Sequence, residues 1–443
     1  MKKARIPYID QEILEDVKTP LLAAVDLGST SIVVYVMDGL TGRRLSVRSM
    51  LNPQKKYGAD VVTRSSYALE HGAGILSSCA GEAVNHLLRE VARECGRSSE
   101  DIVRIVMVGN TCMHHLFLNI PTDTLVVAPH KPKVKEAVKR NALDCGLLVH
   151  PSAQLWWLPN IGGFVGGDTV GDILASGLHE QEDLILLVDI GTNAELVLGN
   201  CRRRFACSTA AGSAFEGVKT SCGMRSSEGA IDHVTEEGGR LLYHVIGGTQ
   251  AVGICGSGLL DAAACLLKTG FLDESGRMEK TWHFTSKVGV SRKDIRELQL
   301  AKAAIAAGIR LLCSRYGARF SDIREVQLAG AFGSYMDPSS ACAVGLFPAE
   351  LEHRIRPIGN AAGEGAQRAA LYVEEYEACS LLAEETEFLE LAGDREFSDA
   401  FMEELQFPVQ AGVSAVLPSQ SDKKTKADKA VPEDRRNPSS ECF

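Results

Sequence analysis

The chain of 443 residues is too long for one compact core, and its composition, 45% hydrophobic and 23% charged, is ordinary for a globular protein. A net charge of −10 leaves no basic surplus to neutralise phosphates, which argues against nucleic-acid or anionic-membrane partners. No apolar run is long enough to cross a membrane, and the basic N-terminus lacks the apolar core of a secretory signal, so we expect a cytoplasmic protein.

Changes in sequence pattern divide the chain into five parts. We expect a lead-in segment at 1–20, a first lobe at 21–180, a second lobe at 181–350, C-terminal helices at 351–395 that return to the first lobe, and a polar, disordered tail at 396–443.

The thirteen cysteines are scattered singly through apolar segments, and no two of them form a Cys-x-x-Cys pair. This usage predicts reduced, buried thiols, and no iron–sulfur cluster is predicted in this chain.

A short polar turn between two apolar strands occurs twice. "LLAAVDLGSTSIVVYVMD" at 21–38 returns as "LILLVDIGTNAELVLGN" at 184–200. The glycine lets backbone N–H groups approach an anion closely, and the hydroxyl groups add donors. One such turn is common in hairpins, whereas two copies are specific. The predicted phosphate-binding residues are Gly28, Ser29, Thr30, Ser31, Gly191, Thr192 and Asn193.

A second pair of segments follows in the same order. "EDIVRIVMVGN" at 100–110 corresponds to "SDIREVQLAG" at 321–330, because each is a polar corner that leads into a buried strand ending in glycine. The two pairs indicate a duplicated α/β unit, with both turns facing one cleft. Asp26 and Asp189 would then both bind one Mg²⁺ ion through water molecules, and both would contact the water that attacks the phosphate. Without a cation the two carboxylates would repel each other, which predicts Mg²⁺ dependence.

Several elements are predicted from hydrophobic periodicity. Helices are expected at 80–96, 294–317 and 364–392, the last as one or two helices, and a hairpin at 234–245.

Two further glycine-rich motifs complete the predicted site. "LAGAFGSYMD" at 328–337 places small residues where a base and ribose would lie, although a plain tight turn is an alternative. "GICGSGLLD" at 253–261 is either a connection between the lobes or a helix start capped by Ser257. The residues assigned to the nucleotide here are Gly256, Ser257, Gly330, Ala331, Phe332 and Gly333.

In this order, the five landmarks resemble the actin-like ATPase superfamily, which includes acetate and sugar kinases, actin and heat-shock chaperones. The resemblance implies a duplicated, ribonuclease H-like α/β fold with two lobes around an ATP cleft. It makes "VDLGSTS" and "VDIGTNAE" the phosphate motifs, "VMVGNT" and "GICGSGLLD" the connecting motifs, and "LAGAFG" the adenosine motif.

Other blocks narrow the resemblance. "LNPQKKYGADVVTR" at 51–64, "LPNIGGFVGGD" at 158–168 and "IGNAAGEGAQRAAL" at 358–371 are similar to ATP-dependent reductive activators of corrinoid proteins. That branch implies an ATPase that drives return of a corrinoid from Co(II) to Co(I) in methyltransferase systems. A homodimer is expected from the resemblance alone.

One departure from the branch concerns the electron. Its members usually carry an iron–sulfur domain, but this sequence has no clustered cysteines before or after the matching region. A separate iron–sulfur protein is therefore expected to supply electrons, unless the chain serves another client. In a related group, the 2-hydroxyacyl-CoA dehydratase activators, a cluster bridges two subunits. The alternative here is a bridging cluster held by Cys207, with or without Cys222.

Three other functions stay open on sequence alone. A small-molecule kinase of the acetate and sugar kinase superfamily would use the same cleft with a substrate group in place of water. An activator of a 2-hydroxyacyl-CoA dehydratase-like enzyme would serve another client, and a degenerate scaffold would bind no nucleotide. Three residues are weaker site candidates: Asn110 for water near the phosphate or for capping the next helix, Glu216 for the ribose or the cleft, and Asp168 without an assigned role.

Overall fold

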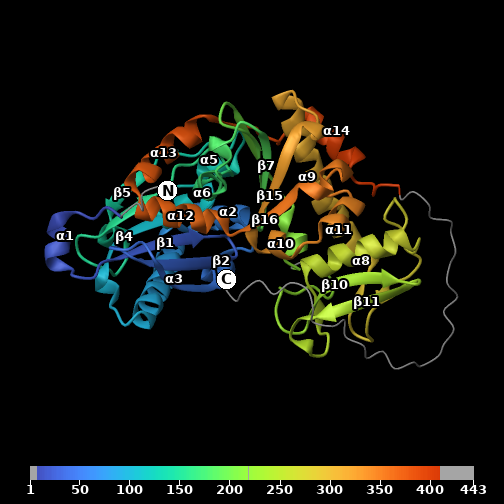
Figure 1. Ribbon diagram of the computed structural model, residues 1–443, viewed down its shortest axis with the longest axis horizontal. Coiled ribbons are helices and arrows are strands. Elements are labelled where there is room, and N and C mark those ends of the chain that lie inside the picture. The colour runs from blue at the N-terminus through green and yellow to red at the C-terminus, as the bar shows by residue number, and fades with distance from the viewer. Residues whose placement is uncertain (1–6, 218, 410–443) are drawn as a thin grey trace.

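Two six-stranded sheets form the centres of two lobes (Figure 1). The structure is a computed structural model that describes residues 7–217 and 219–409. The first sheet has the order β3-β2-β1-β4-β6-β5 and the second β16-β15-β7-β8-β9-β17. Their strands are β1 (Leu21–Leu27), β2 (Ser31–Asp38), β3 (Arg44–Leu51), β4 (Ile102–Val108), β5 (Val138–Asn141), β6 (Gln154–Trp157), β7 (Leu184–Ile190), β8 (Ala194–Gly199), β9 (Arg204–Thr209), β15 (Ile323–Ala329), β16 (Ile355–Gly359) and β17 (Thr386–Phe388).

Helices and smaller sheets surround these strands. The short strands are β10 (Ala230–Glu237), β11 (Arg240–Val245), β12 (Gly253–Ile254), β13 (Trp282–His283) and β14 (Gly289–Val290). The α-helices are α1 (Gln11–Asp16), α2 (Val61–His71), α3 (Gly74–Glu94), α4 (Thr111–Phe117), α5 (Asp123–Val126), α6 (Gly167–Ser176), α7 (Gly212–Phe215), α8 (Gly256–Lys268), α9 (Arg292–Tyr316), α10 (Gly330–Tyr335), α11 (Pro338–Ala343), α12 (Ala361–Leu371), α13 (Val373–Glu384) and α14 (Arg395–Glu403).

The two sheets repeat one pairing pattern. β1 runs antiparallel to β2 and parallel to β4, and β7 runs antiparallel to β8 and parallel to β15. A 3₁₀ turn precedes both parallel partners, η2 (Ser99–Asp101) before β4 and η6 (Phe320–Asp322) before β15. The apolar runs of β4 and β7 are buried on both faces, as strands at the centre of a covered sheet must be. The predicted duplicated α/β fold is therefore confirmed.

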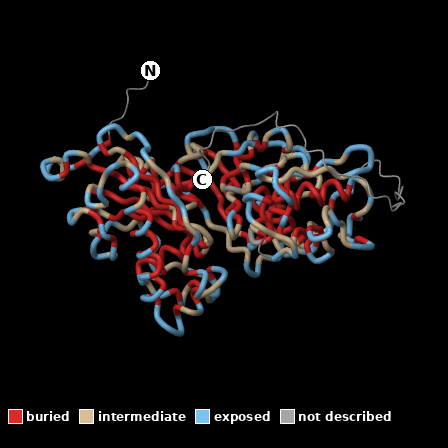
Figure 2. Tube along the Cα trace, turned by 90° about the horizontal axis from the view of Figure 1, so that it is seen from below, coloured by how far each residue is buried: buried red, intermediate tan, exposed pale blue. Residues whose placement is uncertain are grey.

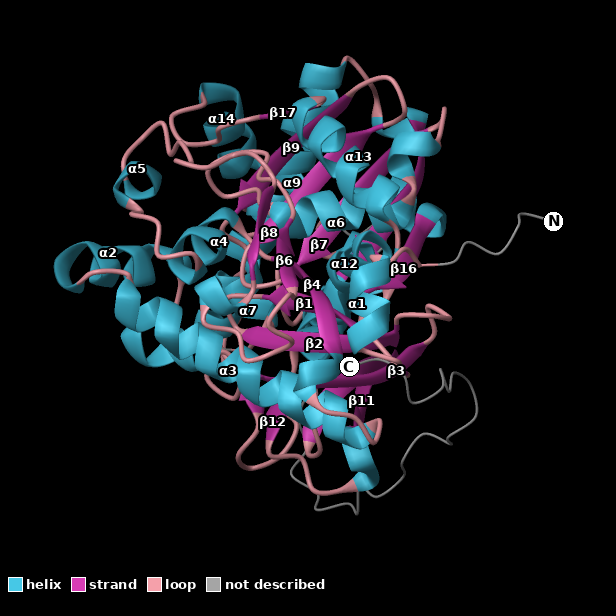
Figure 3. Ribbon diagram, turned by 90° about the vertical axis from the view of Figure 1, so that its left-hand side faces the viewer, coloured by secondary structure: helices cyan, strands magenta, loops and turns pink. Residues whose placement is uncertain are grey.

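Helices α6 and α12 lie together between strands of the two sheets (Figure 3). One buried cluster joins Leu22 of β1, Ile185 of β7 and Ala366 of α12, and Figure 2 shows such buried residues concentrated at the centres of both lobes. The two helices approach backbone to backbone, because a Cβ added at Gly365 would lie 2.1 Å from the Gly171 carbonyl oxygen. The lobes are thus connected by a tightly packed helix pair.

The predicted secondary structure differs from the observed one near the end of the third predicted helical region. α3 and α9 occupy the first two predicted helices, and α9 ends at Gly317 with a φ of 80°. The third prediction, 364–392, covers α12 and α13 but is wrong beyond Glu384, where the strand β17 pairs with β9. A free sheet edge selects extended backbone there over the local helical pattern.

The prediction of a disordered tail from residue 396 is wrong for residues 396–409. Helix α14 packs along α9, with Arg310 2.7 Å from Glu403 and Arg315 2.7 Å from Asp394. Phe407 beyond it is only 2% exposed. Charged residues of this segment pair with α9 and form one face of the helix. Residues 410–443, with Cys442, and residues 1–6 lie outside the described part.

The predicted hairpin is confirmed by the antiparallel pairing of β10 with β11. Within the described residues no helix combines the length and the apolarity that a membrane crossing requires.

Candidate functional site

The two predicted phosphate turns meet in space. The first connects β1 to β2 and the second connects β7 to β8, and they touch through their threonines. Thr30 Oγ1 lies 2.7 Å from Thr192 Oγ1, and the two hydroxyl groups are hydrogen-bonded to each other. Each also lies within hydrogen-bond distance of Glu216, Thr30 at 3.2 Å from Oε2 and Thr192 at 3.4 Å from Oε1. The turns therefore face one shared point between the lobes.

The two aspartates of the turns are held by residues from other elements. Asn360, which precedes α12, donates from Nδ2 to Asp26 Oδ2 at 3.0 Å. Gly330, at the start of α10, has a φ of +81°, and a Cβ there would lie 2.6 Å from Asp189 Oδ1. Glycine is required here for two reasons. Most residues avoid a positive φ, and any side chain would clash with the Asp189 carboxylate. The "LAGAFG" motif thus lies directly against the second aspartate.

Five buried carboxyl groups form one interacting cluster that includes the aspartates of both turns. Burial raises the pKa of Asp26 to about 6, with the Asn360 hydrogen bond opposing the rise. Burial, together with the charge of Asp26, raises the pKa of Asp189 to about 7. The pKa of Asp168 is also raised to about 7, by burial and by the charges of Asp189 and Asp26. The pKa values of Asp172 and Glu195 are raised well above their usual range by burial and by neighbouring carboxylates. Such a group of acids favours a cation.

The residues present fit a magnesium ion. Asp172 Oδ1 is buried and has no hydrogen-bond partner within the described residues, and the carboxylates around it raise one another's pKa. No group of three or more His, Cys, Asp or Glu side chains in the described ranges has an arrangement that could hold a metal by itself. Mg²⁺ commonly takes one or two carboxylates and completes its shell with water and phosphate oxygens, so the two observations agree.

Two asparagines support the first turn. Asn52 donates from Nδ2 to the Gly28 carbonyl oxygen at 2.8 Å, and its backbone N–H donates to the Thr30 carbonyl oxygen at 2.9 Å. Asn110 caps α4 by accepting from the Met113 N–H and donates to Ser29 Oγ at 2.9 Å. The capping alternative for Asn110 is correct, and the residue contacts the turn as well.

The remaining predicted nucleotide residues lie in the second lobe. Ser257 is buried and donates to the Asp232 carbonyl oxygen at 2.8 Å; the helix cap is Cys255, so the alternative that Ser257 caps α8 is wrong. A Cβ at Gly256 would lie 2.2 Å from the Phe215 carbonyl oxygen. Phe332 of α10 stacks near Phe215, with ring centroids 4.5 Å apart.

The other predicted residues lie in the two turns and in α10. Ser31 begins β2, and its carbonyl oxygen would lie 2.8 Å from a Cβ at Gly28. Gly191 donates from its N–H to the Asn193 carbonyl oxygen at 2.9 Å. Ala331 and Gly333 follow Gly330 within α10, where Gly333 packs against Leu328.

Sequence reasoning missed four residues of this neighbourhood. They are Asn52, Asp172, Glu195 and Asn360. Asp172 lies four residues after Asp168, one helical turn further along α6, and this spacing is a signal that could have indicated it. Asn360 caps α12, and this cap alone is enough to explain an asparagine before a helical run, so its bond to Asp26 had no separate signal in the sequence.

The cysteines proposed as cluster alternatives lie in different environments. Cys207 is fully buried in β9, and burial raises the pKa of its thiol. Cys222 is partly buried, and its thiol lies 3.4 Å from the Lys287 carbonyl oxygen. A cluster bridging two subunits would require Cys207 to leave the sheet interior.

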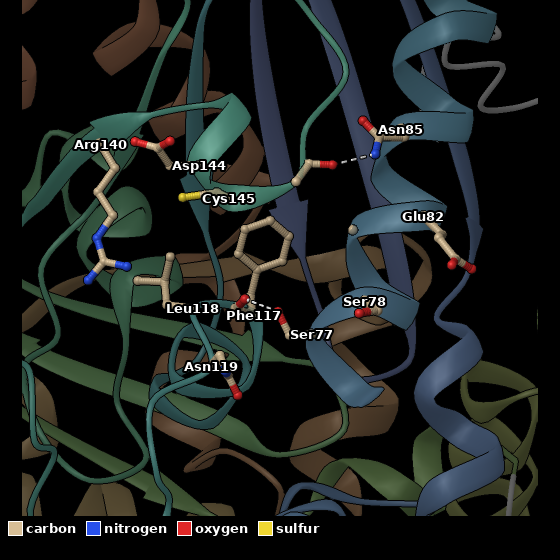
Figure 4. A pocket seen from close by; sticks show the side chains of 12 residues that line it. Ser77, Ser78, Glu82, Asn85, Phe117, Leu118, Asn119, Arg140, Asp144 and Cys145 are labelled. Atoms are coloured by element: carbon tan, nitrogen blue, oxygen red, sulfur yellow. Dashed lines mark hydrogen bonds between the residues drawn. The ribbon is translucent and has the colours of Figure 1, made fainter. Parts of the chain in front are cut away.

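A hollow of about 440 Å³ lies away from the two turns, in the first lobe (Figure 4). Helix α3, the end of α4 and the segment around Cys145 line it, and Asn85 closes one end by donating to the Gly146 carbonyl oxygen. None of the predicted nucleotide residues reaches it, so it is a separate feature of the surface.

Comparisons with known proteins identify the family. Residues 21–181 match the family described as "RACo middle region", and residues 183–415 match "C-terminal domain of RACo the ASKHA domain". This chain belongs to the RACo family. The actin-like fold and the resemblance to reductive activators of corrinoid proteins are thereby confirmed, and the boundary between the two matches lies close to the predicted boundary of the lobes.

Three relatives support this membership. The chain is 35% identical over 415 residues to the corrinoid activation enzyme RamQ of Eubacterium limosum, covering 87% of this chain and 70% of the relative. It is 26% identical over 360 residues to the [Co(II) methylated amine-specific corrinoid protein] reductase of Methanosarcina barkeri, covering 73% and 65%. A solved reductive activator for corrinoid, iron–sulfur protein superposes with a TM-score of 0.80 at 31% identity, covering 88% and 66%. The chain thus spans about two thirds of these relatives' lengths.

Proposed function

We propose that this RACo-family chain binds and hydrolyses ATP to drive the reductive activation of a corrinoid protein from Co(II) to Co(I). The observation that carries the proposal is the contact of the two phosphate turns, 2.7 Å apart at Thr30 and Thr192, beside a cluster of buried carboxylates. Donors from both lobes beside acids that favour a cation are the environment that a magnesium-bound nucleotide requires.

Asp26 and Asp189 have different neighbours, which suggests how their roles in ATP hydrolysis differ. Asp26 and Asp189 would hold Mg²⁺ through water, and the ion would neutralise the phosphate charge that develops during hydrolysis. Asp189 is the group next to Asp172 and Gly330, so it would orient the attacking water. The backbone of the turns at Gly28 and Gly191, with the threonine hydroxyls, would hold the phosphates.

The nucleoside would lie in the second lobe. Phe332, stacked near Phe215, and the small residues of α10 would hold the base and ribose, and Gly256 and Ser257 would back them from the start of α8. These assignments rest on the order of the motifs together with their position beside Asp189.

The same contact suggests how ATP could act on a partner. Each phosphate turn belongs to a different lobe, so ATP, ADP and the empty site would favour different separations of the lobes. A partner that prefers one separation would be bound and released as ATP is turned over. We propose a corrinoid protein as that partner, a separate iron–sulfur protein as the electron donor, and a homodimer as the assembly.

Cobalt spectroscopy tests the proposal. A candidate corrinoid protein in the Co(II) state is incubated with this chain, Mg-ATP, a reductant and an iron–sulfur protein, and Co(I) is followed by its absorption. We expect ATP-dependent Co(I) formation that Asp189→Ala abolishes and that Asp183→Ala, at an exposed site just before the same strand, leaves unchanged.

Two results would contradict this function. Unchanged cobalt reduction by Asp189→Ala would remove the mechanism. ATP turnover stimulated by a small metabolite, and not by a corrinoid protein, would instead support a kinase.

A further inference from the structure

Glu216 makes a contact that a bound phosphate would also need. It follows α7 directly, and each of its carboxylate oxygens lies within hydrogen-bond distance of a different threonine hydroxyl group, Oε2 at 3.2 Å from Thr30 and Oε1 at 3.4 Å from Thr192. One oxygen thus engages each phosphate turn, and each turn belongs to a different lobe. A terminal phosphate that bridged the turns would accept from the same two hydroxyl groups.

The surroundings of Glu216 are those of an anion site. Burial raises the pKa of its carboxyl group, but the hydrogen bonds from both threonines and the positive charges of Arg225 and Lys55 oppose the rise. Lys55 belongs to the first lobe, in η1 (Pro53–Tyr57), and Arg225 to the second, so each lobe supplies one hydroxyl group and one cation. The carboxylate occupies the centre of this set.

A carboxylate and a phosphate cannot share this position. Both are negatively charged, and the threonine hydroxyl groups at 2.7 Å from each other leave no space for a phosphate oxygen between them. Binding of a terminal phosphate therefore requires Glu216 to withdraw and the two hydroxyl groups to separate.

We propose that Glu216 is a resident anion that competes with the terminal phosphate of the nucleotide for Thr30 and Thr192. This rests on the proposed nucleotide site. By holding the turns together, Glu216 lowers the affinity for ATP, because only the fraction of molecules with a withdrawn carboxylate binds it. When the terminal phosphate leaves, the carboxylate returns and reconnects the two lobes.

Calorimetric titration of the full chain tests the competition. Mg²⁺ complexes of a non-hydrolysable ATP analogue, ADP and AMP are titrated into the wild type, Glu216→Gln, Glu216→Ala and the control Glu237→Gln, an exposed carboxyl group on β10. We expect the Kd of the ATP analogue to fall by about fivefold or more in both Glu216 variants, with a smaller fall for ADP and none for AMP. The control should bind like the wild type.

Comparing the ATP analogue with AMP distinguishes competition by Glu216 from the other possible roles of this residue. Weaker ATP binding in the variants would mean that Glu216 supports the nucleotide, and equal changes for ATP and AMP would mean a structural role; either overturns the competition. If the wild type binds no nucleotide at all, the proposed function fails and the competition fails with it. If the wild type binds ATP and the variants do not bind it more tightly, only the competition fails.

Discussion

The Asn360 side chain donates a hydrogen bond of 3.0 Å to Oδ2 of Asp26 across 334 positions of the chain. The same side chain caps α12 through Oδ1, which accepts from the Gly363 N–H at 2.8 Å. One amide therefore links the start of the interlobe helix to the first phosphate turn, and it lowers the pKa of an acid that burial raises.

Asn360→Asp separates these two roles. Aspartate keeps the cap but replaces the donor with a second negative charge, so the pKa of Asp26 should rise above about 6. We expect ATP hydrolysis at pH 7 to fall by about tenfold and its pH profile to move upwards. Asn360→Ser, which retains a cap without adding charge, is the control. A profile that coincides with that of the wild type would contradict a role for the amide at Asp26.

The acid cluster predicts how stability depends on pH. Asp26, Asp168 and Asp189 have pKa values of about 6, 7 and 7, above the value of 3.8 in an unfolded chain. The folded protein holds protons that the unfolded chain releases, so without divalent cations the free energy of unfolding decreases as pH rises from about 4 to 7. Thermal unfolding at pH 5 and pH 8 measures this loss, and Mg-ATP should restore more stability at pH 8.

Asp172→Asn checks the origin of that loss. Burial and neighbouring carboxylates raise the pKa of Asp172, so at high pH folding must either bury its charge or bind a proton there, whereas the amide requires neither. We therefore expect the variant to have a Tm higher than the wild type by about 2–4 °C at pH 8, with a smaller difference at pH 5. The reverse pattern, a gain confined to low pH, would show that the cluster does not limit stability.

Gly330→Ala tests the contact between the "LAGAFG" motif and Asp189. Its Cβ would lie 2.6 Å from Asp189 Oδ1, in addition to the strain of a φ of +81°. Gly359→Ala is a matched control, because its φ is +70° and its Cβ would meet nothing within 4 Å. The control should lose about 1–2 kcal/mol of stability from strain alone. We expect Gly330→Ala to lose more and also to lose nucleotide binding; equal effects at the two positions would show that Asp189 tolerates the displacement.

Asn52→Ala should weaken nucleotide binding through the first turn. The side chain is 1% exposed and holds the Gly28 carbonyl oxygen at 2.8 Å, so its removal frees the turn and leaves that oxygen unpaired. We expect the Kd for ATP to rise by about tenfold or more. Asn85→Ala is the control, since Asn85 is also buried and holds the Gly146 carbonyl oxygen at 2.8 Å away from the turns. A similar loss of stability with unchanged Kd is expected for the control, whereas an equal rise in Kd would point to a global effect.

The sequence predicted the parts of the fold that local pattern encodes. The strands around Asp26 and Asp189 are apolar runs with a polar turn, and their repetition indicated the symmetry of the sheets. The strand β17 and helix α14 were missed because their conformation depends on an edge of β9 and on a face of α9, which lie far away in the sequence. In the candidate site, both aspartates were predicted from their turns, whereas Asn52 and Asn360 act through contacts that no local spacing records.

Strand β1 pairs with β2 and β4 in the same way as β7 pairs with β8 and β15. Each repeat therefore has one acidic turn, and both turns lie at the boundary between the repeats. Neither repeat could surround a ligand there alone. Any change that moves one repeat relative to the other therefore alters both sides of the site at once, the side supported by Asn52 and the side contacted by Glu216.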